Sequence, residues 1–248
     1  MGRSLMMAAL TAAIGLAAPA LAQMSPPIAA ALADPSRPPK DQALDAQRRP
    51  AEIMAFIGLR PGQTIVDVWP GAYWDRLFSD VVGSGGQVIA WTPAEAAKAE
   101  HLTMPQDGSH PYPDHPNVVA YGGPVNSFAI SAPVDVVWIR QNYHDLYDPF
   151  MGPADVAGFN KAVFRALKPG GIYVVIDHSA PDGSELASTN TTHRIDAAVV
   201  KKDMAAAGFQ FVGESPVLRN PADARDKVVF DPAIRGRTDQ FVYIFRKP

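Results

Sequence analysis

The sequence predicts a doubly wound α/β fold whose seven-stranded sheet ends in an antiparallel strand. Short runs rich in Val and Ile alternate with helical patterns, as in parallel βαβ units. Near the C-terminus two strands follow each other with no helix between them, which favours an antiparallel last strand. The length of 248 residues suits one such domain, and the chain has no internal repeat.

The clearest start of a βαβ unit is the segment QTIVDVWPGAYWDRLF, residues 63–78. Residues 64–68 form a β-branched run, a Pro-Gly turn closes it, and apolar residues then recur at helical spacing. Asp67 lies near the end of this strand, and Gly71 lies in the bend, where a ligand can approach the backbone. Ligands of open α/β sheets bind beyond the carboxyl ends of the strands, so we expect this turn to line a site.

The other elements follow from the same two periodicities. Residues 41–58 predict a helix, or two short helices because Pro50 interrupts the pattern. Residues 102–116 are expected to form a lid or a mobile insertion, and residues 217–238 a polar insertion. The remaining predicted helices are 75–82, 93–100, 155–167 and 193–208, and the predicted strands are 64–68, 87–91, 117–121, 134–139, 172–177, 209–214 and 240–246.

Composition excludes several kinds of site and partner. The net charge of −3 gives no sign of a nucleic-acid or anionic-membrane partner. The chain has no cysteine, which excludes disulfides, zinc–thiolate sites and a thiol nucleophile. Composition says nothing about the oligomeric state, and a small-molecule partner is expected from the strand-end turn described above.

Residues 1–22 have the pattern of a secretory signal peptide. Arg3 supplies a positive charge before an apolar segment, and Ala20-Leu21-Ala22 is an A-x-A cleavage site that predicts a mature start at Gln23. The alternative is an uncleaved anchor, but the apolar segment is short and Ala-rich for a membrane span. We expect a periplasmic or secreted protein with no stable membrane insertion after cleavage. Residues 23–40 would be an Ala/Pro-rich linker and residues 41–248 the domain.

Three segments resemble motifs of the class I S-adenosylmethionine-dependent methyltransferases. IVDVWPGAYW stands in the place of their first glycine-rich motif, APVDVVWIRQNYHDL in that of the fourth-strand motif, and ALKPGGIYVVIDHSA is close to the fifth-strand signature. More narrowly, the chain resembles a group of secreted methyltransferase-like proteins with a WPG turn, here Trp69-Pro70-Gly71. The resemblance implies a Rossmann-like sheet, S-adenosylmethionine as cofactor, and methyl transfer to a small acceptor.

The resemblance also implies roles for residues at the ligand-facing edge. Asp67 and Gly71 would hold the methionyl part of the cofactor, and Trp91 would pack on its adenosine. The full cofactor-binding set implied in this way is Asp67, Trp69, Gly71, Trp91 and Asn142.

Candidate bases follow two predicted strands that should be neighbours. Methyl transfer requires an aligned acceptor and a base for its proton. His144 follows the fourth strand, and Asp177 and His178 follow the fifth, so all three are catalytic candidates at one edge of the sheet. The substrate-binding candidates are Tyr143, His193 and Arg194, of which the last two are expected to begin a helix whose N-terminus favours an anion.

Departures from the family motifs keep a second function open. Trp69 and Tyr73 stand where the outer glycines of the first motif would be, and Trp91-Thr92-Pro93 stands where the ribose-binding acid usually is. These departures favour, as the alternative, a catalytically inactive methyltransferase-like binding protein of the periplasm.

A third function ranks last. His144, Asp145, His178 and His193 could form a metal-dependent hydrolytic site, since imidazole and carboxylate suit zinc, manganese or iron. No H-x-x-H or HExxH spacing supports such a site, so we expect no metal ion.

Overall fold

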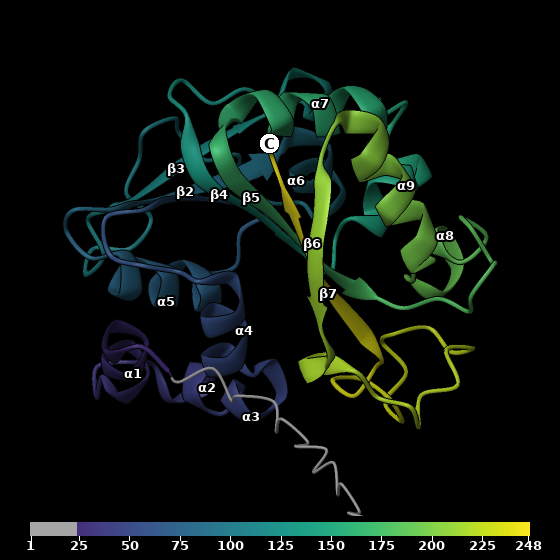
Figure 1. Ribbon diagram of the computed structural model, residues 1–248, viewed down its shortest axis with the longest axis horizontal. Coiled ribbons are helices and arrows are strands. Elements are labelled where there is room, and N and C mark those ends of the chain that lie inside the picture. Colours follow the sequence, from purple (N-terminus) through teal and green to yellow (C-terminus); the bar gives the residue numbers. More distant parts are fainter. Residues whose placement is uncertain (1–23) are drawn as a thin grey trace, which may run out of the picture.

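The computed structural model describes residues 24–248 and has three layers, with one sheet between two layers of helices (Figure 1). The expected signal peptide and its cleavage before Gln23 lie outside the described residues. Among residues 24–248, no helix has the length and hydropathy needed to cross a membrane.

The sheet has seven strands in the order β3-β2-β1-β4-β5-β7-β6. The first five strands of the chain pair in parallel, and β7 runs antiparallel to both β5 and β6. This confirms the predicted doubly wound sheet with an antiparallel last strand. The strands are β1 (Thr64–Val68), β2 (Gln87–Pro93), β3 (Val118–Gly123), β4 (Val134–Arg140), β5 (Leu167–His178), β6 (Gln210–Ser215) and β7 (Gln240–Arg246).

Helices cover both faces of the sheet (Figure 1), and each face has its own apolar core. One core receives side chains from α1, α4 and α5, and the other from α6, α7 and α9. The helices are α1 (Pro26–Ala33), α2 (Pro39–Gln42), α3 (Asp45–Arg48), α4 (Pro50–Ile57), α5 (Ala72–Val82), α6 (Ala94–Ala99), α7 (Val156–Ala166), α8 (Thr189–Thr192) and α9 (Ala197–Ala207).

The N-terminal segment differs from the expected linker and helix. The linker was expected to be extended or mobile, but it contains helix α1. Ile28 of α1 is buried in the same apolar core as the side chains of α5. Residues 41–58 were expected to form one or two helices, but they hold the end of α2 and all of α3 and α4. Arg49 has a left-handed φ of 50° and ends α3, and Pro50 then begins α4, because proline is favoured in the first turn.

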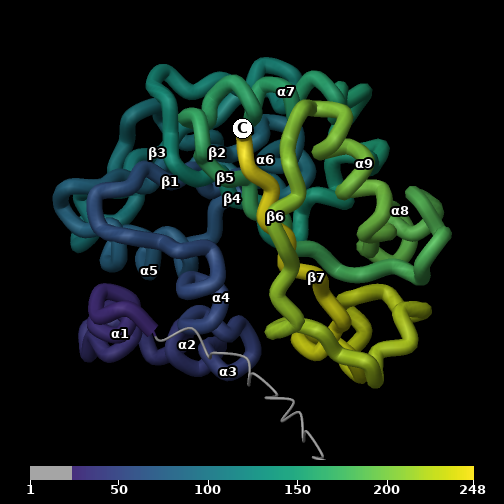
Figure 2. The backbone as a smooth tube through the Cα atoms, in the orientation of Figure 1, coloured from purple at the N-terminus to yellow at the C-terminus, as the bar shows by residue number. Residues whose placement is uncertain are grey.

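The two long insertions are packed against the domain. In the segment 102–116, Ser109 forms an antiparallel bridge with Ala120 of β3, and the Tyr112 hydroxyl donates to Asp75 on α5 at 2.9 Å. The β6–β7 segment lies at the end of the sheet where β7 begins (Figure 2). There the Val229 amide donates to the Thr192 carbonyl oxygen, so this segment lies against α8.

The helix expected over residues 193–208 begins later, and the prediction that His193 and Arg194 open it is wrong. α9 begins at Ala197, because the Asp196 side chain accepts the Ala198 amide at 2.9 Å and caps the helix there. His193 instead follows α8 with a left-handed φ of 54°. It therefore lies at the C-terminal end of a short helix, where no helix N-terminus is available to bind an anion.

Candidate functional site

Two adjoining cavities lie at the carboxyl ends of β1, β4 and β5, the edge where the sequence predicts a site. The larger, here called the histidine cavity, has a volume of about 430 Å³, within the range of about 300–1,000 Å³ typical of small-molecule sites. The smaller, here called the Asp67 cavity, measures about 290 Å³. The two cavities share the side chains of Trp69, Glu100, Gln141 and Asn142.

Asp177, at the end of β5, holds His144 in a fixed orientation. Nδ1 of His144 lies 2.9 Å from Oδ1 of Asp177, and the His144 backbone amide donates to Oδ2 at 2.8 Å. The backbone amide of His178 also donates to Oδ1 at 2.7 Å. Because Asp177 is fully buried and takes part in three hydrogen bonds, it holds the His144 ring in one orientation. Nε2 of His144 is then the ring nitrogen that can contact other groups.

Nε2 of His144 faces Asp145 and His193 in the histidine cavity. It lies 3.3 Å from Oδ1 of Asp145 and 3.3 Å from Nδ1 of His193. Burial lowers the pKa of His144, but the carboxylates of Asp177, Asp145 and Asp148 outweigh burial and raise it to about 9. With no other cation present, His144 is therefore an imidazolium at neutral pH, held between carboxylates.

His178 presents a second imidazole to the same cavity, with the opposite electrostatics. Its Nδ1 lies 2.8 Å from the hydroxyl oxygen of Thr238. Burial and the positive charges of His144, Arg140 and Arg194 lower the pKa of His178 well below its usual value. His178 is thus neutral at neutral pH, and its ring is a weaker base than an imidazole in water.

The Asp67 cavity is lined by a buried acid and a partly buried guanidinium. Asp67 is the second-last residue of β1 and Arg140 the last of β4, and both line this cavity together with Gly71. Burial and the neighbouring Asp75 raise the pKa of Asp67, and burial together with the charge of Arg48 lowers the pKa of Arg140 to about 9. No ion pair joins Asp67 to Arg140 within residues 24–248, and in that range Nε of Arg140 has no hydrogen-bond partner.

Three residues with left-handed backbone conformations line the histidine cavity. The φ values are 67° for Trp69, 62° for Gln141 and 54° for His193. A bulky residue such as Trp rarely adopts a positive φ, and such conformations cluster at functional sites. At Trp69 the conformation brings the indole Nε1 within 2.9 Å of Glu100, to which it donates across the opening of the β1 turn.

The structure brings most of the predicted site residues together. Three of them, His144, His178 and His193, line the histidine cavity. Asp177 does not line it, but it is hydrogen-bonded to the His144 ring from behind. Asp67, Trp69, Gly71 and Asn142, predicted for the cofactor, all line the Asp67 cavity.

Three predicted site residues lie away from both cavities. Tyr143 is fully buried, and its hydroxyl donates to Asp203 at 3.0 Å and accepts from Asn160. Trp91 is buried against Phe128, so it does not reach a ligand at the strand ends. The assignment of Tyr143 to substrate and of Trp91 to adenosine therefore finds no support in their positions.

Arg194, also predicted to bind substrate, has a structural partner instead. Its fully buried guanidinium pairs with Asp223 of the β6–β7 segment at 2.9 Å and donates to the Ser179 carbonyl oxygen at 3.0 Å. Arg194 thus ties this segment to the end of β5, which places Val229 and Phe230 in the wall of the histidine cavity.

Glu100 is a site residue that sequence reasoning missed. It lines both cavities, and it follows β2 by way of α6, which is only six residues long. Because α6 is so short, the residue that follows it is still close to the carboxyl ends of the strands. The short length of the predicted helix is therefore the signal that could have identified Glu100. Glu95, which stands nearer to β2, accepts the Val125 amide and is absent from both cavity walls.

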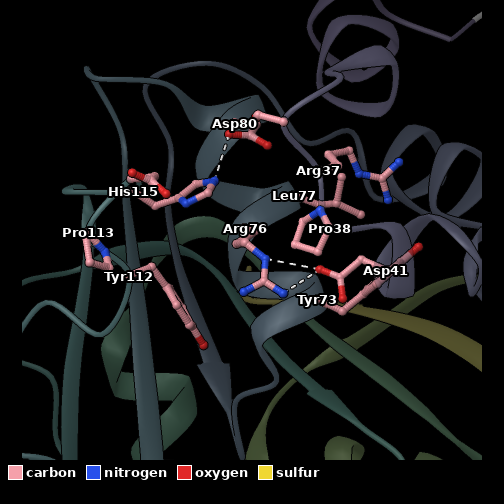
Figure 3. A pocket seen from close by; sticks show the side chains of 12 residues that line it. Arg37, Pro38, Asp41, Tyr73, Arg76, Leu77, Asp80, Tyr112, Pro113 and His115 are labelled. Atoms are coloured by element: carbon pink, nitrogen blue, oxygen red, sulfur yellow. Dashed lines mark hydrogen bonds and ion pairs between the residues drawn. The ribbon is translucent and has the colours of Figure 1, made fainter.

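A third cavity, of about 230 Å³, lies between α5, the α1–α2 segment and residues 112–115 (Figure 3). Most of its charged groups are paired: Arg76 with Asp41, His115 with Asp80 at 3.2 Å, and Arg37 with Asp45 at 2.7 Å. Because most of its charged side chains are already paired and it lies away from the strand ends, it is not the candidate active site.

Comparison with solved structures identifies the fold. A S-adenosylmethionine-dependent methyltransferase from Aquifex aeolicus superposes with a TM-score of 0.51 at 19% identity, over 84% of this chain and 97% of that one. The chain has the class I methyltransferase fold. A putative sarcosine dimethylglycine methyltransferase from Galdieria sulphuraria gives a TM-score of 0.54 at 14% identity, over 84% of this chain and 87% of that one.

The class I methyltransferase fold does not by itself determine the reaction. The [4+2]-cyclase SpnF superposes equally well, with a TM-score of 0.53 at 17% identity, over 84% of this chain and 81% of that one. No family model and no curated protein matches the sequence. The function must therefore be argued from the two cavities.

Proposed function

We propose that this protein is a S-adenosylmethionine-dependent methyltransferase acting on a small acceptor. The observation that carries the proposal is the pair Asp67 and Arg140, which line one cavity at the strand ends without pairing with each other. An amino-acid group carries an ammonium and a carboxylate on one carbon. A carboxyl group and a guanidinium that line the same cavity without forming an ion pair are complementary to that group.

The cofactor, when bound, supplies an electrophilic methyl group on a sulfonium. Asp67 would accept the ammonium of its methionyl part, and Arg140, with Arg48 at the same cavity, would hold the carboxylate. Gly71 leaves the backbone open there, since a Cβ added to it would meet no atom within 4 Å. The residues of the Asp67 cavity therefore fit the amino-acid end of the cofactor.

Glu100 and Trp69 would position the middle of the cofactor, because they belong to the walls of both cavities. Glu100 offers the carboxylate that the second strand itself lacks, and it can accept hydrogen bonds from a ribose diol. The acceptor would then lie in the histidine cavity, where the neutral imidazole of His178 could accept a hydrogen bond from it.

Titration calorimetry with S-adenosylmethionine and with its demethylated product tests the proposal on residues 23–248. We expect binding with a Kd near or below about 100 µM, which is about −5.5 kcal/mol. Asp67→Asn and Arg140→Met should each weaken binding at least about 10-fold, since each removes one charge complementary to the amino-acid group. The control Asp114→Asn, an exposed residue of the third cavity, should bind as the parent does.

A second function, a catalytically inactive binding protein, is favoured by one observation. Met104 packs against Gly122 at the end of β3, so closely that a Cβ on Gly122 would lie 2.4 Å from the Met104 methyl carbon. The methyltransferases that the chain resembles often have an Asp after the third strand for the adenine amino group, whereas this chain has Gly122 and Gly123 there, with Met104 against Gly122. A folded protein that gives no heat with either cofactor form would support this second function.

A periplasmic or secreted location remains part of the proposal, because the signal peptide lies outside the described residues. It is supported by the positive start, apolar segment and A-x-A site of residues 1–22.

A further inference from the structure

Three potential ligand atoms converge in the histidine cavity. They are Nε2 of His144, Oδ1 of Asp145 and Nδ1 of His193, and they lie within 4.8 Å of one another. The separations are 3.3 Å from His144 to Asp145, 3.3 Å from His144 to His193, and 3.7 Å from His193 to Asp145.

We propose that His144, Asp145 and His193 bind a divalent transition-metal ion, with Zn²⁺ as the best-fitting ion. The inference goes beyond methyl transfer and does not depend on it, since none of the three ligands is assigned to the cofactor. It also changes the expectation drawn from the sequence, which favoured a site without metal.

The spacing of the three atoms matches tetrahedral coordination. With bonds of about 2.0–2.1 Å to nitrogen and oxygen, the ligand atoms of a tetrahedral Zn²⁺ lie about 3.3 Å apart. Octahedral coordination at similar bond lengths would bring neighbouring ligand atoms to about 3.0 Å. All three observed separations are at or above the tetrahedral value, so an ion fits among the atoms with a small inward movement of His193.

The groups behind the ligands are those that a metal site requires. A histidine ligand usually donates its other ring nitrogen to a carboxylate, which fixes the tautomer and the ring orientation. Nδ1 of His144 does so to Asp177 at 2.9 Å, leaving Nε2 as the ligand atom. The second oxygen of Asp145 accepts from the Asn142 side chain at 3.0 Å, which turns Oδ1 toward the two histidines.

The position of His193 is difficult to explain by internal packing alone. Its residue has a left-handed backbone, and its ring is held beside Phe230 at a centroid distance of 4.9 Å with Nδ1 directed at another imidazole. Two imidazole nitrogens and a carboxylate oxygen at one point suit Zn²⁺, for which imidazole is a common ligand. Three protein ligands leave a fourth position for water or an acceptor atom, as in catalytic zinc sites.

Direct metal titration tests the inference without any cofactor. Tag-free protein of residues 23–248 is treated with a chelator, exchanged into buffer and titrated with ZnCl₂ by calorimetry. We expect one ion per chain at micromolar Kd or tighter. His193→Ala should weaken binding about 100-fold, and because its side chain is 30% exposed this variant is expected to fold. Asp145→Asn should also weaken it, with folding checked by circular dichroism.

The control is His115→Ala, which removes one of the six histidines of the chain but lies in the third cavity. It should bind Zn²⁺ as the parent does. Absence of binding in the parent, or equal weakening in His193→Ala and His115→Ala, would overturn the inference. If the parent protein bound Zn²⁺ but not S-adenosylmethionine, only the proposed methyltransferase function would be contradicted.

Discussion

The carboxylate of Asp177 lies 2.9 Å from Nδ1 of His144 and receives the backbone amides of both His144 and His178. The fully buried Asp177 side chain at the end of β5 thus fixes the positions of His178, the next residue, and of His144 in the loop after β4. The pairing of neighbouring strands β4 and β5 makes this possible. It sets Arg140, the last residue of β4, opposite Ile176, so Asp177 lies next to the loop that holds His144.

Asp177→Asn should weaken Zn²⁺ binding by about 10–100-fold, because the amide no longer holds the His144 tautomer by a charged hydrogen bond. Calorimetric titration measures the change, and a circular dichroism spectrum checks that the variant is folded. The comparison variant is Asp135→Asn, whose carboxylate accepts from the Thr64 amide and Lys168 at the opposite end of β4. Unchanged affinity in folded Asp177→Asn would contradict the role given to Asp177.

Arg194→Ala should destabilise the protein by about 3–5 kcal/mol, because it leaves Asp223 buried without its partner. Urea unfolding followed by fluorescence measures the free energy. Arg235→Ala, an exposed arginine of the same segment, should leave the unfolding midpoint unchanged. If Arg194 served only to bind substrate, its removal would leave stability near that of the parent.

Stability should fall as the pH rises from about 4 to about 6 because of Asp75. Burial raises the pKa of Asp75 to about 6, whereas in the unfolded chain it is near 3.8. Between these values the folded protein holds a proton that the unfolded chain has lost, so raising the pH favours unfolding. Asp75→Asn removes this group.

The check is the difference in unfolding free energy between the parent and Asp75→Asn, measured at several pH values. The parent should lose stability relative to the variant between about pH 4 and pH 6 and show no further relative change well above pH 6. A difference that is independent of pH would show that Asp75 titrates in the folded protein as it does in water.

Glu100→Gln should lower the affinity for S-adenosylmethionine about 10-fold, because the ribose would lose a charged acceptor. The expected effect on methionine itself is none, since Glu100 is placed at the ribose. Competition binding with both compounds measures the contrast. Glu214→Gln, a half-exposed glutamate on β6, is the matched control. An equal loss for both compounds would place Glu100 elsewhere in the binding mode.

Expression of the full chain in a bacterium should yield a periplasmic protein that begins at Gln23. Signal peptidase cuts after the A-x-A sequence that ends at Ala22. Intact mass spectrometry of the periplasmic fraction gives the mature start, and a chain lacking residues 1–22 should stay in the cytoplasm. Recovery of uncleaved protein in the membrane fraction would favour the alternative of an anchor.

The sequence by itself determined the sheet and most of its ligand-facing edge. Each strand is a local apolar run, and parallel strands joined by helices must all point their carboxyl ends the same way, so Asp67, His144, Asp177 and His178 could be placed at one edge without coordinates. The same local signals do not report how a turn is shaped, and the helix predicted to begin at His193 began four residues later.

The tertiary structure alone decided which candidate side chains line the cavities and which are buried elsewhere. Tyr143 and Arg194 turned inward to Asp203 and Asp223, partners 60 and 29 residues away, which no local pattern encodes. Glu100 reached the cavities because α6 is short, and His193 reached His144 because the β6–β7 segment and a left-handed backbone hold it there. Strands and helices arise from neighbours in sequence, whereas the geometry of a site depends on contacts between distant loops.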